Sequence, residues 1–121
     1  MHTGESAEMY LECILELAEE QGEVRSIDVA HKTGYSKPSV SRAMGLLKKS
    51  GHIDVDESGY ITLSASGRAI AEKIFERHRL ITQFLMKLGV NPETAAEDAC
   101  KIEHVISDES FAKIKEFAGR F

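Results

Sequence analysis

Apolar residues in the first part of the chain recur at the spacing of a helix that buries one face. Between residues 5 and 21 these positions are Ala7, Tyr10, Leu11, Ile14, Leu17 and Ala18, and Gly22 follows them. The pattern predicts an amphipathic helix that ends at Gly22. Two shorter helices are predicted next. One runs from its N-cap Ser26 to Gly34, and the other begins at Ser36 and stops before Gly51.

The spacing of apolar residues changes from helical to alternating after the third helix. The alternating positions are Ile53, Val55, Ile61 and Leu63, and Glu57-Ser58-Gly59 lies between the two pairs. This is the pattern of a short β-hairpin. Helical spacing returns at Ser64 and continues to Gly89. Asn91-Pro92-Glu93 and Ser107-Asp108-Glu109 are the start signals of two further helices, and the first of these is expected to reach Ile106.

The order of these elements indicates a fold class. Two short helices separated by a turn that contains Gly34, followed by a hairpin, describe a winged helix-turn-helix. We therefore expect a mainly α protein with an N-terminal winged helix-turn-helix DNA-binding domain at residues 1–63. An all-helical domain is expected at residues 64–121. Its apolar residues exceed what one small helical domain can bury, which predicts a homodimer; they are Leu80, Phe84, Leu85, Leu88, Phe111, Ile114 and Phe117.

Composition places the chain among ordinary soluble globular proteins. Of its 121 residues, 42% are hydrophobic and 29% are charged. There is no apolar run of about 18 residues that could span a membrane, and the N-terminal MHTGESAEMY lacks the features of a secretory signal. Cys13 and Cys100 are too few cysteines for a disulfide framework, so a reducing cytoplasmic location is expected. Cys13 lies beside apolar residues and is interpreted as part of the core.

The distribution of charge matters more than its sum. The net charge of −5 argues against constitutive binding to nucleic acid, but residues 37–49 hold four basic residues and no acid. A recognition helix places short polar and basic side chains near its N-terminus, where they reach DNA. The candidate DNA-binding residues are Ser36, Lys37, Pro38, Ser39, Ser41 and Arg42. Arg42 can read a guanine edge or grip a phosphate, whereas the acidic hairpin is given a weak role.

Three residues near the end of the chain have the spacing of metal ligands. Cys100, Glu103 and His104 stand at i, i+3 and i+4, which places a thiolate, a carboxylate and an imidazole on one face of a helix. On the first helix, Met9 and Glu12 similarly present a thioether and a carboxylate. The alternative is structural: a small buried cysteine, a solvated glutamate and a hydrogen-bonded histidine. Spacing alone leaves both interpretations open.

Five segments together resemble the metal-dependent repressors typified by the diphtheria toxin repressor and the manganese transport regulator. They are Glu8-Met9-Tyr10-Leu11-Glu12, Lys37-Pro38-Ser39-Val40-Ser41, Thr62-Leu63-Ser64-Ala65-Ser66-Gly67, Arg77-His78-Arg79-Leu80 and residues 100–108, CKIEHVISD. The likeness covers essentially the whole chain, in order and at the family's spacing. It implies a repressor of metal-uptake genes that binds operator DNA as a homodimer, with a divalent metal as corepressor. It also implies that residues 64–121 form the helical metal-binding and dimerisation domain.

The resemblance also implies a set of metal ligands. Met9, Cys100, Glu103 and His104 match the principal site of the iron-responsive branch, His78 matches a histidine of both branches, and Glu12 matches a carboxylate of the manganese branch. Where the iron branch has a further glutamate and histidine, this chain has Thr82 and Ala96, which puts a second site in doubt. The expected architecture is that of the shorter members, without the C-terminal barrel-like domain.

Ligand chemistry bears on which metal is expected. A thiolate and a thioether favour Fe(II), Co(II), Ni(II) or Zn(II), whereas carboxylate-rich sites suit Mn(II). We therefore expect Fe(II) first and Mn(II) next as corepressor, with Zn, Co or Ni able to substitute. The alternative function is a winged-helix transcription regulator that does not depend on metal. A small metalloenzyme or metal-storage protein is a further rival, but the sequence has no nucleophile–base constellation and no phosphate-binding glycine loop, so no enzyme is expected.

Overall fold

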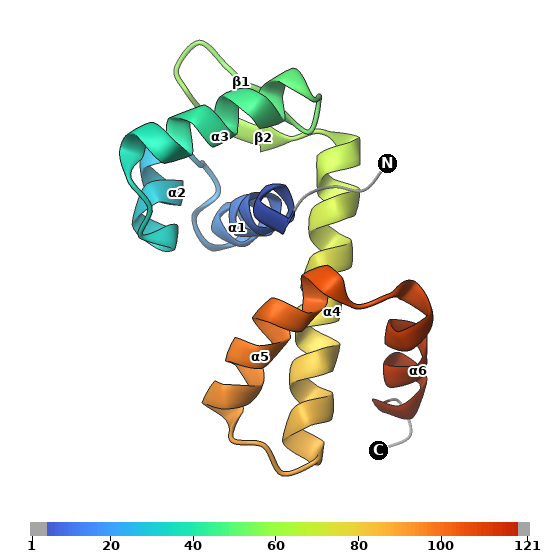
Figure 1. The fold of residues 1–121 in the computed structure, drawn as a ribbon. Helices are drawn as coiled ribbons and strands as arrows, with labels where there is room; N and C mark the ends of the chain where they lie inside the picture. Colours follow the sequence, from blue (N-terminus) through green and yellow to red (C-terminus); the bar gives the residue numbers. More distant parts are fainter. Residues whose placement is uncertain (1–4, 119–121) are drawn as a thin grey trace. The chain divides into compact units, whose positions relative to one another are not determined.

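The computed structural model describes residues 5–118, and residues 1–4 and 119–121, the outer ends of the two predicted domains, lie outside the described part. Its elements follow the predicted order (Figure 1). They are α1 (Glu5–Gln21), α2 (Ser26–Thr33), α3 (Lys37–Lys49), β1 (Ile53–Val55), β2 (Ile61–Leu63), α4 (Ala65–Lys87), α5 (Pro92–Val105) and α6 (Asp108–Ala118). The expected mainly α fold with a winged helix-turn-helix at its start is confirmed.

The chain divides into two compact units, and the division between residues 72 and 73 falls inside α4. Unit 1 therefore holds α1–α3, the hairpin and the start of α4. Unit 2 holds the rest of α4 with α5 and α6. The predicted domain boundary between residues 63 and 64 stays a prediction, because α4 continues through the division of the units.

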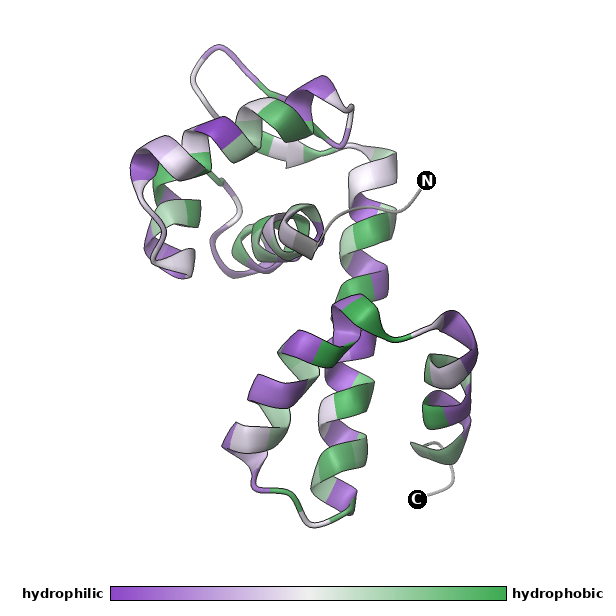
Figure 2. Cartoon of the chain, viewed as in Figure 1, coloured by the Kyte–Doolittle hydropathy of each residue, from purple (hydrophilic) through white to green (hydrophobic). Residues whose placement is uncertain are grey.

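Unit 1 is built around the apolar faces of its three helices. Leu11 and Ile14 of α1, Val29 of α2 and Val40 of α3 are at most 1% exposed and belong to one core cluster. The hairpin closes this core with Ile53, whose register partner is Leu63. Green and purple segments alternate along each helix in Figure 2, as expected for helices that bury one face and expose the other.

Capping side chains set where the helices of unit 1 begin. Ser36 caps α3 as predicted, since its hydroxyl accepts the Ser39 N–H at 3.3 Å. The prediction that Ser26 caps α2 was wrong. Ser26 is the first helical residue and Arg25 occupies the N-cap, where its N–H donates to the Asp28 carboxylate at 2.8 Å. A carboxylate in the first turn can satisfy a free backbone N–H as a capping serine would.

The start of α4 is packed against the backbone that precedes the hairpin. Ser64 caps this helix, accepting the Gly67 N–H at 3.2 Å and donating its own hydroxyl to the Gly51 carbonyl at 2.7 Å. A Cβ at Gly67 would lie 2.0 Å from the His52 carbonyl oxygen. Only glycine fits at that position, which explains the glycine of the TLSASG segment by a close approach of two backbones.

Unit 2 has a thinner apolar core that a buried arginine supplements. Ile81 of α4, Ala99 of α5 and Phe111 of α6 form its buried cluster. Arg77 of α4 is 5% exposed, and its guanidinium lies 5.3 Å from the ring centroid of Phe111. At the other end of α4, Phe84 meets Phe117 of α6 edge to face, with ring centroids 5.8 Å apart. Both α5 and α6 thus pack on α4 (Figure 1).

Among the described residues, no helix combines the length and the apolar character that crossing a membrane requires.

Candidate metal centre and nucleic-acid interface

The N-terminal half of α3 presents the predicted DNA-binding residues to solvent. Val40 and Met44 turn inward and hold the helix to the core, so the remaining directions face outward. All six predicted residues are exposed: Ser36, Lys37, Pro38, Ser39, Ser41 and Arg42. The side chains therefore have the accessibility that contact with DNA requires, and their role in binding stays a prediction.

A pocket of about 350 Å³ lies between the beginnings of α2 and α3. Ser26, Ile27, Lys37 and Ser41 line it. Ser26 and Ile27 were not among the predicted DNA-binding residues. Both stand at the N-terminus of α2, and the N–H groups at a helix N-terminus suit phosphate oxygens.

The acidic turn of the hairpin has a structural explanation. The Asp56 carboxylate accepts the N–H groups of Ser58 and Tyr60, both at 2.9 Å, and so closes the turn. At the base of the hairpin the Arg25 guanidinium lies 4.3 Å from the ring centroid of Tyr60, a cation–π contact. This hairpin thus uses one of its carboxylates to form its own turn, in keeping with the weak DNA role expected for it.

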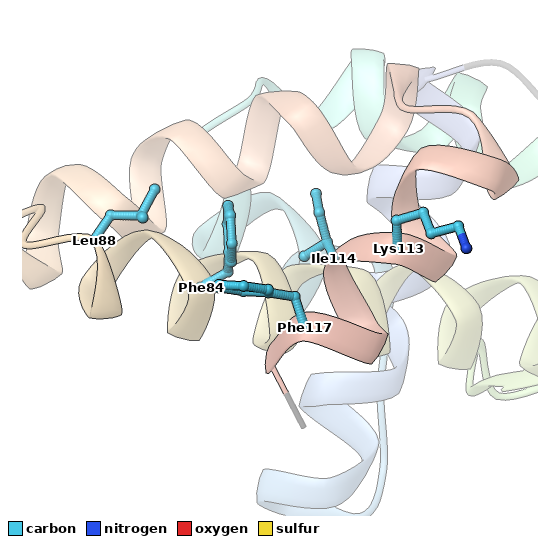
Figure 3. Close-up of a pocket in the computed structure, with 5 residues that line it drawn as sticks. All are labelled: Phe84, Leu88, Lys113, Ile114 and Phe117. Atoms are coloured by element: carbon cyan, nitrogen blue, oxygen red, sulfur yellow. The ribbon is translucent and has the colours of Figure 1, made fainter. Parts of the chain in front are cut away.

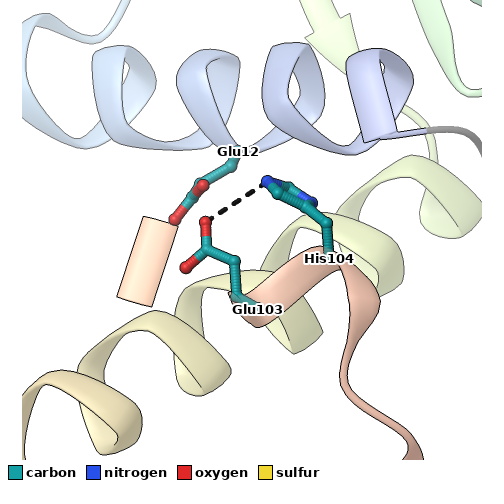
Figure 4. Close-up of side chains that lie close together, drawn as sticks. All are labelled: Glu12, Glu103 and His104. Carbon is teal, nitrogen blue, oxygen red and sulfur yellow. Dashed lines mark ion pairs between the residues drawn. The ribbon is translucent and has the colours of Figure 1, made fainter. Parts of the chain in front are cut away.

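The last turns of α5 hold a buried pair of metal-ligand types. Glu103 is 0% exposed and His104 is 8% exposed. His104 Nε2 lies 3.4 Å from Glu103 Oε1 (Figure 4), and on the other side His78 Nδ1 of α4 lies 2.9 Å from Glu103 Oε2. Three residues predicted as metal ligands are therefore brought together within unit 2, with the carboxylate between two imidazoles.

One oxygen of this cluster lacks a hydrogen-bond partner. Among the described residues, Glu103 Oε1 is fully buried and accepts no hydrogen bond. Leaving a buried carboxylate oxygen unsatisfied is costly, and a cation would remove that cost. A carboxylate and imidazoles are also donors that divalent transition metals accept. The residues present in unit 2 therefore fit a divalent metal.

The other predicted ligands differ in their setting. Cys100 is exposed on α5, one turn before Glu103, so its thiol is accessible while the other two donors of its motif are buried. On α1, Glu12 is buried and Met9 is partly buried. Thr82, which stands where the iron branch has a glutamate, donates its hydroxyl to the His78 carbonyl at 2.7 Å. The Thr82 hydroxyl therefore forms a hydrogen bond within α4 itself.

Cys13 behaves as the sequence predicted. It is 6% exposed and belongs to the core of unit 1. Burial is the main cause that raises the pKa of its thiol to about 11. The group is therefore neutral near pH 7, which suits packing and not metal binding.

An apolar pocket of about 300 Å³ opens between α4 and α6. Phe84, Leu88, Lys113, Ile114 and Phe117 line it (Figure 3). Leu88 is 63% exposed and Phe117 is 44% exposed. Four of the apolar residues from which a dimer was predicted thus lie together at one accessible face of unit 2.

A winged helix-turn-helix followed by a helical unit with a buried carboxylate–imidazole cluster defines a class, that of metal-responsive DNA-binding regulators. Models of two known domains match this chain. Residues 2–60 match the N-terminal DNA-binding domain of the iron dependent repressors, and residues 64–121 match their metal binding and dimerisation domain.

Individual relatives agree with these matches. Transcriptional regulator MntR of Escherichia coli O6:H1 is 35% identical over 116 residues, which cover 96% of this chain and 75% of the relative. The diphtheria toxin repressor of Corynebacterium jeikeium is 33% identical over 106 residues, 87% of this chain and 44% of that protein. The solved structure of a manganese-dependent transcriptional repressor in complex with manganese superposes with a TM-score of 0.84 at 33% identity.

The chain belongs to the iron dependent repressor family. The structural match covers 93% of this chain but 52% of the solved manganese-dependent repressor, so the chain spans about half the length of that structure. Its family is that of metal-dependent repressors, and the relatives carry the names of transcriptional regulators and repressors, not of enzymes. The expectation of a divalent metal is confirmed at the level of the family, and a regulator that does not depend on metal is not favoured.

Proposed function

We propose that the protein is a cytoplasmic homodimeric repressor that binds operator DNA when a divalent transition metal occupies its metal site. The observation that carries the proposal is Glu103 Oε1, a fully buried carboxylate oxygen without a hydrogen-bond partner in the described part of the chain. His78 and His104 stand on either side of this carboxylate. A bound cation would give the unpartnered oxygen of this carboxylate a partner.

The proposed ligand set combines donors from both predicted domains, residues 1–63 and 64–121. Glu103, His104 and His78 are held in unit 2, and Cys100 precedes Glu103 by one turn of α5. Met9 and Glu12 stand one turn apart on α1 of unit 1, and Glu12 is buried there.

One cation bound by donors of both units would link α1 to α5. In a dimer this link would set the separation of the two α3 helices, which must match two half-sites on one face of DNA. The metal can shift that equilibrium only by its higher affinity for the DNA-competent arrangement. Neutralised carboxylates also reduce the repulsion between an acidic protein and phosphate.

The same proposal assigns the DNA contacts to α3. Lys37, Ser39, Ser41 and Arg42 would contact the major groove and its phosphates, and the Ser36 cap and Pro38 would set the start of the helix. Homodimer formation is proposed through the apolar face of α4 and α6, where Phe84 and Phe117 remain accessible. Covering that face would bury apolar side chains that one unit leaves in water.

The proposed order of metals is Fe(II), then Mn(II), with Zn(II), Co(II) or Ni(II) as substitutes. It rests on the soft donors Met9 and Cys100. Operator affinity measured without oxygen across a series of these metals tests both the metal dependence and the order. Operator binding that is equal with and without every metal would overturn the proposal.

A double substitution tests the reason for the metal order. Met9→Asp together with Cys100→Glu replaces two soft donors by carboxylates and should raise the response to Mn(II) relative to Fe(II). Cys100→Ala removes a donor without replacement and should weaken activation by every metal. If the double variant ranks the metals as the unsubstituted protein does, ligand softness does not determine the preference.

A further inference from the structure

The guanidinium of Arg77 contacts all three helices of unit 2, next to the buried Glu103 carboxylate. Arg77 Nη1 donates to the Glu103 carbonyl at 3.1 Å and to the Ile106 carbonyl at 2.8 Å, and Arg77 Nη2 pairs with the Asp108 carboxylate. The two carbonyls belong to the C-terminal end of α5, and Asp108 is the first residue of α6. Arg77 therefore caps α5 from outside and holds the start of α6 with the same group.

Two consecutive residues of α4 contact Glu103, one at its main-chain carbonyl and one at its carboxylate. Arg77 holds its main-chain carbonyl, and His78 lies 2.9 Å from its carboxylate oxygen Oε2. The backbone position and the side-chain direction of Glu103 are thus both fixed from one turn of α4. The remaining oxygen, Oε1, points toward His104 and has no hydrogen-bond partner in the described part of the chain (Figure 4).

The charge of Arg77 is compensated without using the metal ligands. Its guanidinium faces the carbonyl end of α5, the negative end of the helix dipole, and pairs with Asp108, which also meets Lys73 Nζ at 3.1 Å. The Glu103 side chain receives no hydrogen bond from Arg77 in this arrangement. Arg77 therefore does not compete with a cation for the Glu103 carboxylate.

Stability alone is a poor explanation of this arginine. Its Nε is buried and has no hydrogen-bond partner among the described residues, and a buried charge with an unsatisfied N–H is less stabilising than a well-packed apolar side chain of similar size. What arginine supplies is a rigid fork that reaches several oxygens in a fixed geometry.

We propose that Arg77 is a positioning residue of the metal site, which holds the last turn of α5 so that Glu103 and His104 are in place before metal binds. The inference rests on the proposed metal-binding function. Outer groups that orient metal ligands typically change metal affinity by about 10–100-fold when removed. Arg77 would position the backbone of Glu103, whereas His78 contacts the Glu103 side chain.

The test uses Co(II) as the probe, without oxygen, on the whole chain. Arg77→Lys keeps the charge and loses the fork, Arg77→Met loses both, and Arg79→Met removes the same charge from the exposed neighbouring position as a matched control. For each protein the Co(II) dissociation constant, the absorption spectrum of bound Co(II) and the urea unfolding of the metal-free form are measured.

We expect both Arg77 variants to bind Co(II) about 10–100-fold more weakly and to show a changed spectrum, while Arg79→Met matches the unsubstituted protein. If Arg77→Met does not fold, the Co(II) affinity and spectrum of Arg77→Lys test the inference. A folded Arg77→Lys protein with unchanged affinity and spectrum, whatever its stability, would reduce Arg77 to a structural role and overturn the inference. If the unsubstituted protein itself fails to bind Co(II), the proposed function falls, and the inference falls with it.

Discussion

The two units of this chain are stabilised in different ways. Unit 1 buries aliphatic side chains from every one of its elements, including Leu11, Val29 and Ile53. Unit 2 has a small apolar cluster, and its buried residues include Arg77, Glu103 and His104. Burying charge is costly unless partners compensate it. The first unit is therefore held by packing, and the second depends on its charged partners.

This difference suits the two tasks. A domain that reads DNA must present α3 in one constant geometry, which a close-packed core provides. A domain that senses metal must gain stability when metal binds, which requires that its metal-free form leave some groups unsatisfied. Glu103 Oε1 is such a group. The following predictions test this contrast, in order of decreasing expected effect.

The largest effect is expected where two backbones of unit 1 touch. Gly67→Ala places a methyl group 2.0 Å from the His52 carbonyl oxygen and should lower the free energy of unfolding by about 3 kcal/mol or more. Gly45→Ala in α3 is the control, because a Cβ there meets nothing within 4 Å. That control should be up to about 1 kcal/mol more stable, since alanine favours helix. Urea unfolding of both variants measures the effects, and equal stabilities would contradict the close approach.

Metal should stabilise the helix of unit 2 that carries its ligands more than it stabilises the helix-turn-helix. At a metal concentration about 100 times the dissociation constant, binding contributes about 2.7 kcal/mol to the bound form. Hydrogen exchange should therefore slow more at the amides of α5 than at those of α2. Glu103→Gln serves as the control, because it removes the carboxylate charge and should abolish the difference. Equal slowing in α2 and α5 would show that the units do not differ in this respect.

The DNA-reading and metal-binding tasks should be separable by one substitution on α3. Arg42 is exposed in unit 1, so Arg42→Ala should weaken operator binding by about 1–3 kcal/mol if the arginine reads a base. Metal affinity should stay the same, because every metal ligand remains. Titration of the variant with operator and with metal separately measures the two affinities. Operator binding that is undiminished would remove Arg42 from the interface.

The smallest effect concerns the Asp108 carboxylate, which is exposed although one of its two partners, Arg77, is buried. Lys73 first, and Arg77 after it, lower the pKa of Asp108 below its usual range. A lowered folded-state pKa adds stability above the unfolded pKa, and this stability is lost as the pH falls through the folded value, below about pH 4. Asp108→Asn should therefore be slightly less stable than the unsubstituted protein at pH 7 and equal to it in acid. A constant difference in unfolding free energy from pH 7 to pH 2 would refute this explanation.

The sequence determined the elements of this protein and the chemistry of its candidate site. Helix caps such as Ser36 and Asn91 act through N–H groups two or three residues away, so neighbouring residues suffice to predict them. The alternation of Ile53, Val55, Ile61 and Leu63 predicted the hairpin for the same reason. The spacing of Cys100, Glu103 and His104 likewise depends only on one helix. Such local features can be predicted from the sequence without knowledge of the tertiary structure.

Only the tertiary structure decided which side chains are held together and which groups stay unsatisfied. Arg77 has no distinguishing signal in the sequence, because its partners Glu103, Ile106 and Asp108 stand 26 to 31 residues further on. The residues around Gly67 do not predict its close approach to His52. The N-cap of α2, predicted at Ser26, is Arg25 in the folded backbone. Contacts between distant segments arise from packing, and no pattern within either segment records them.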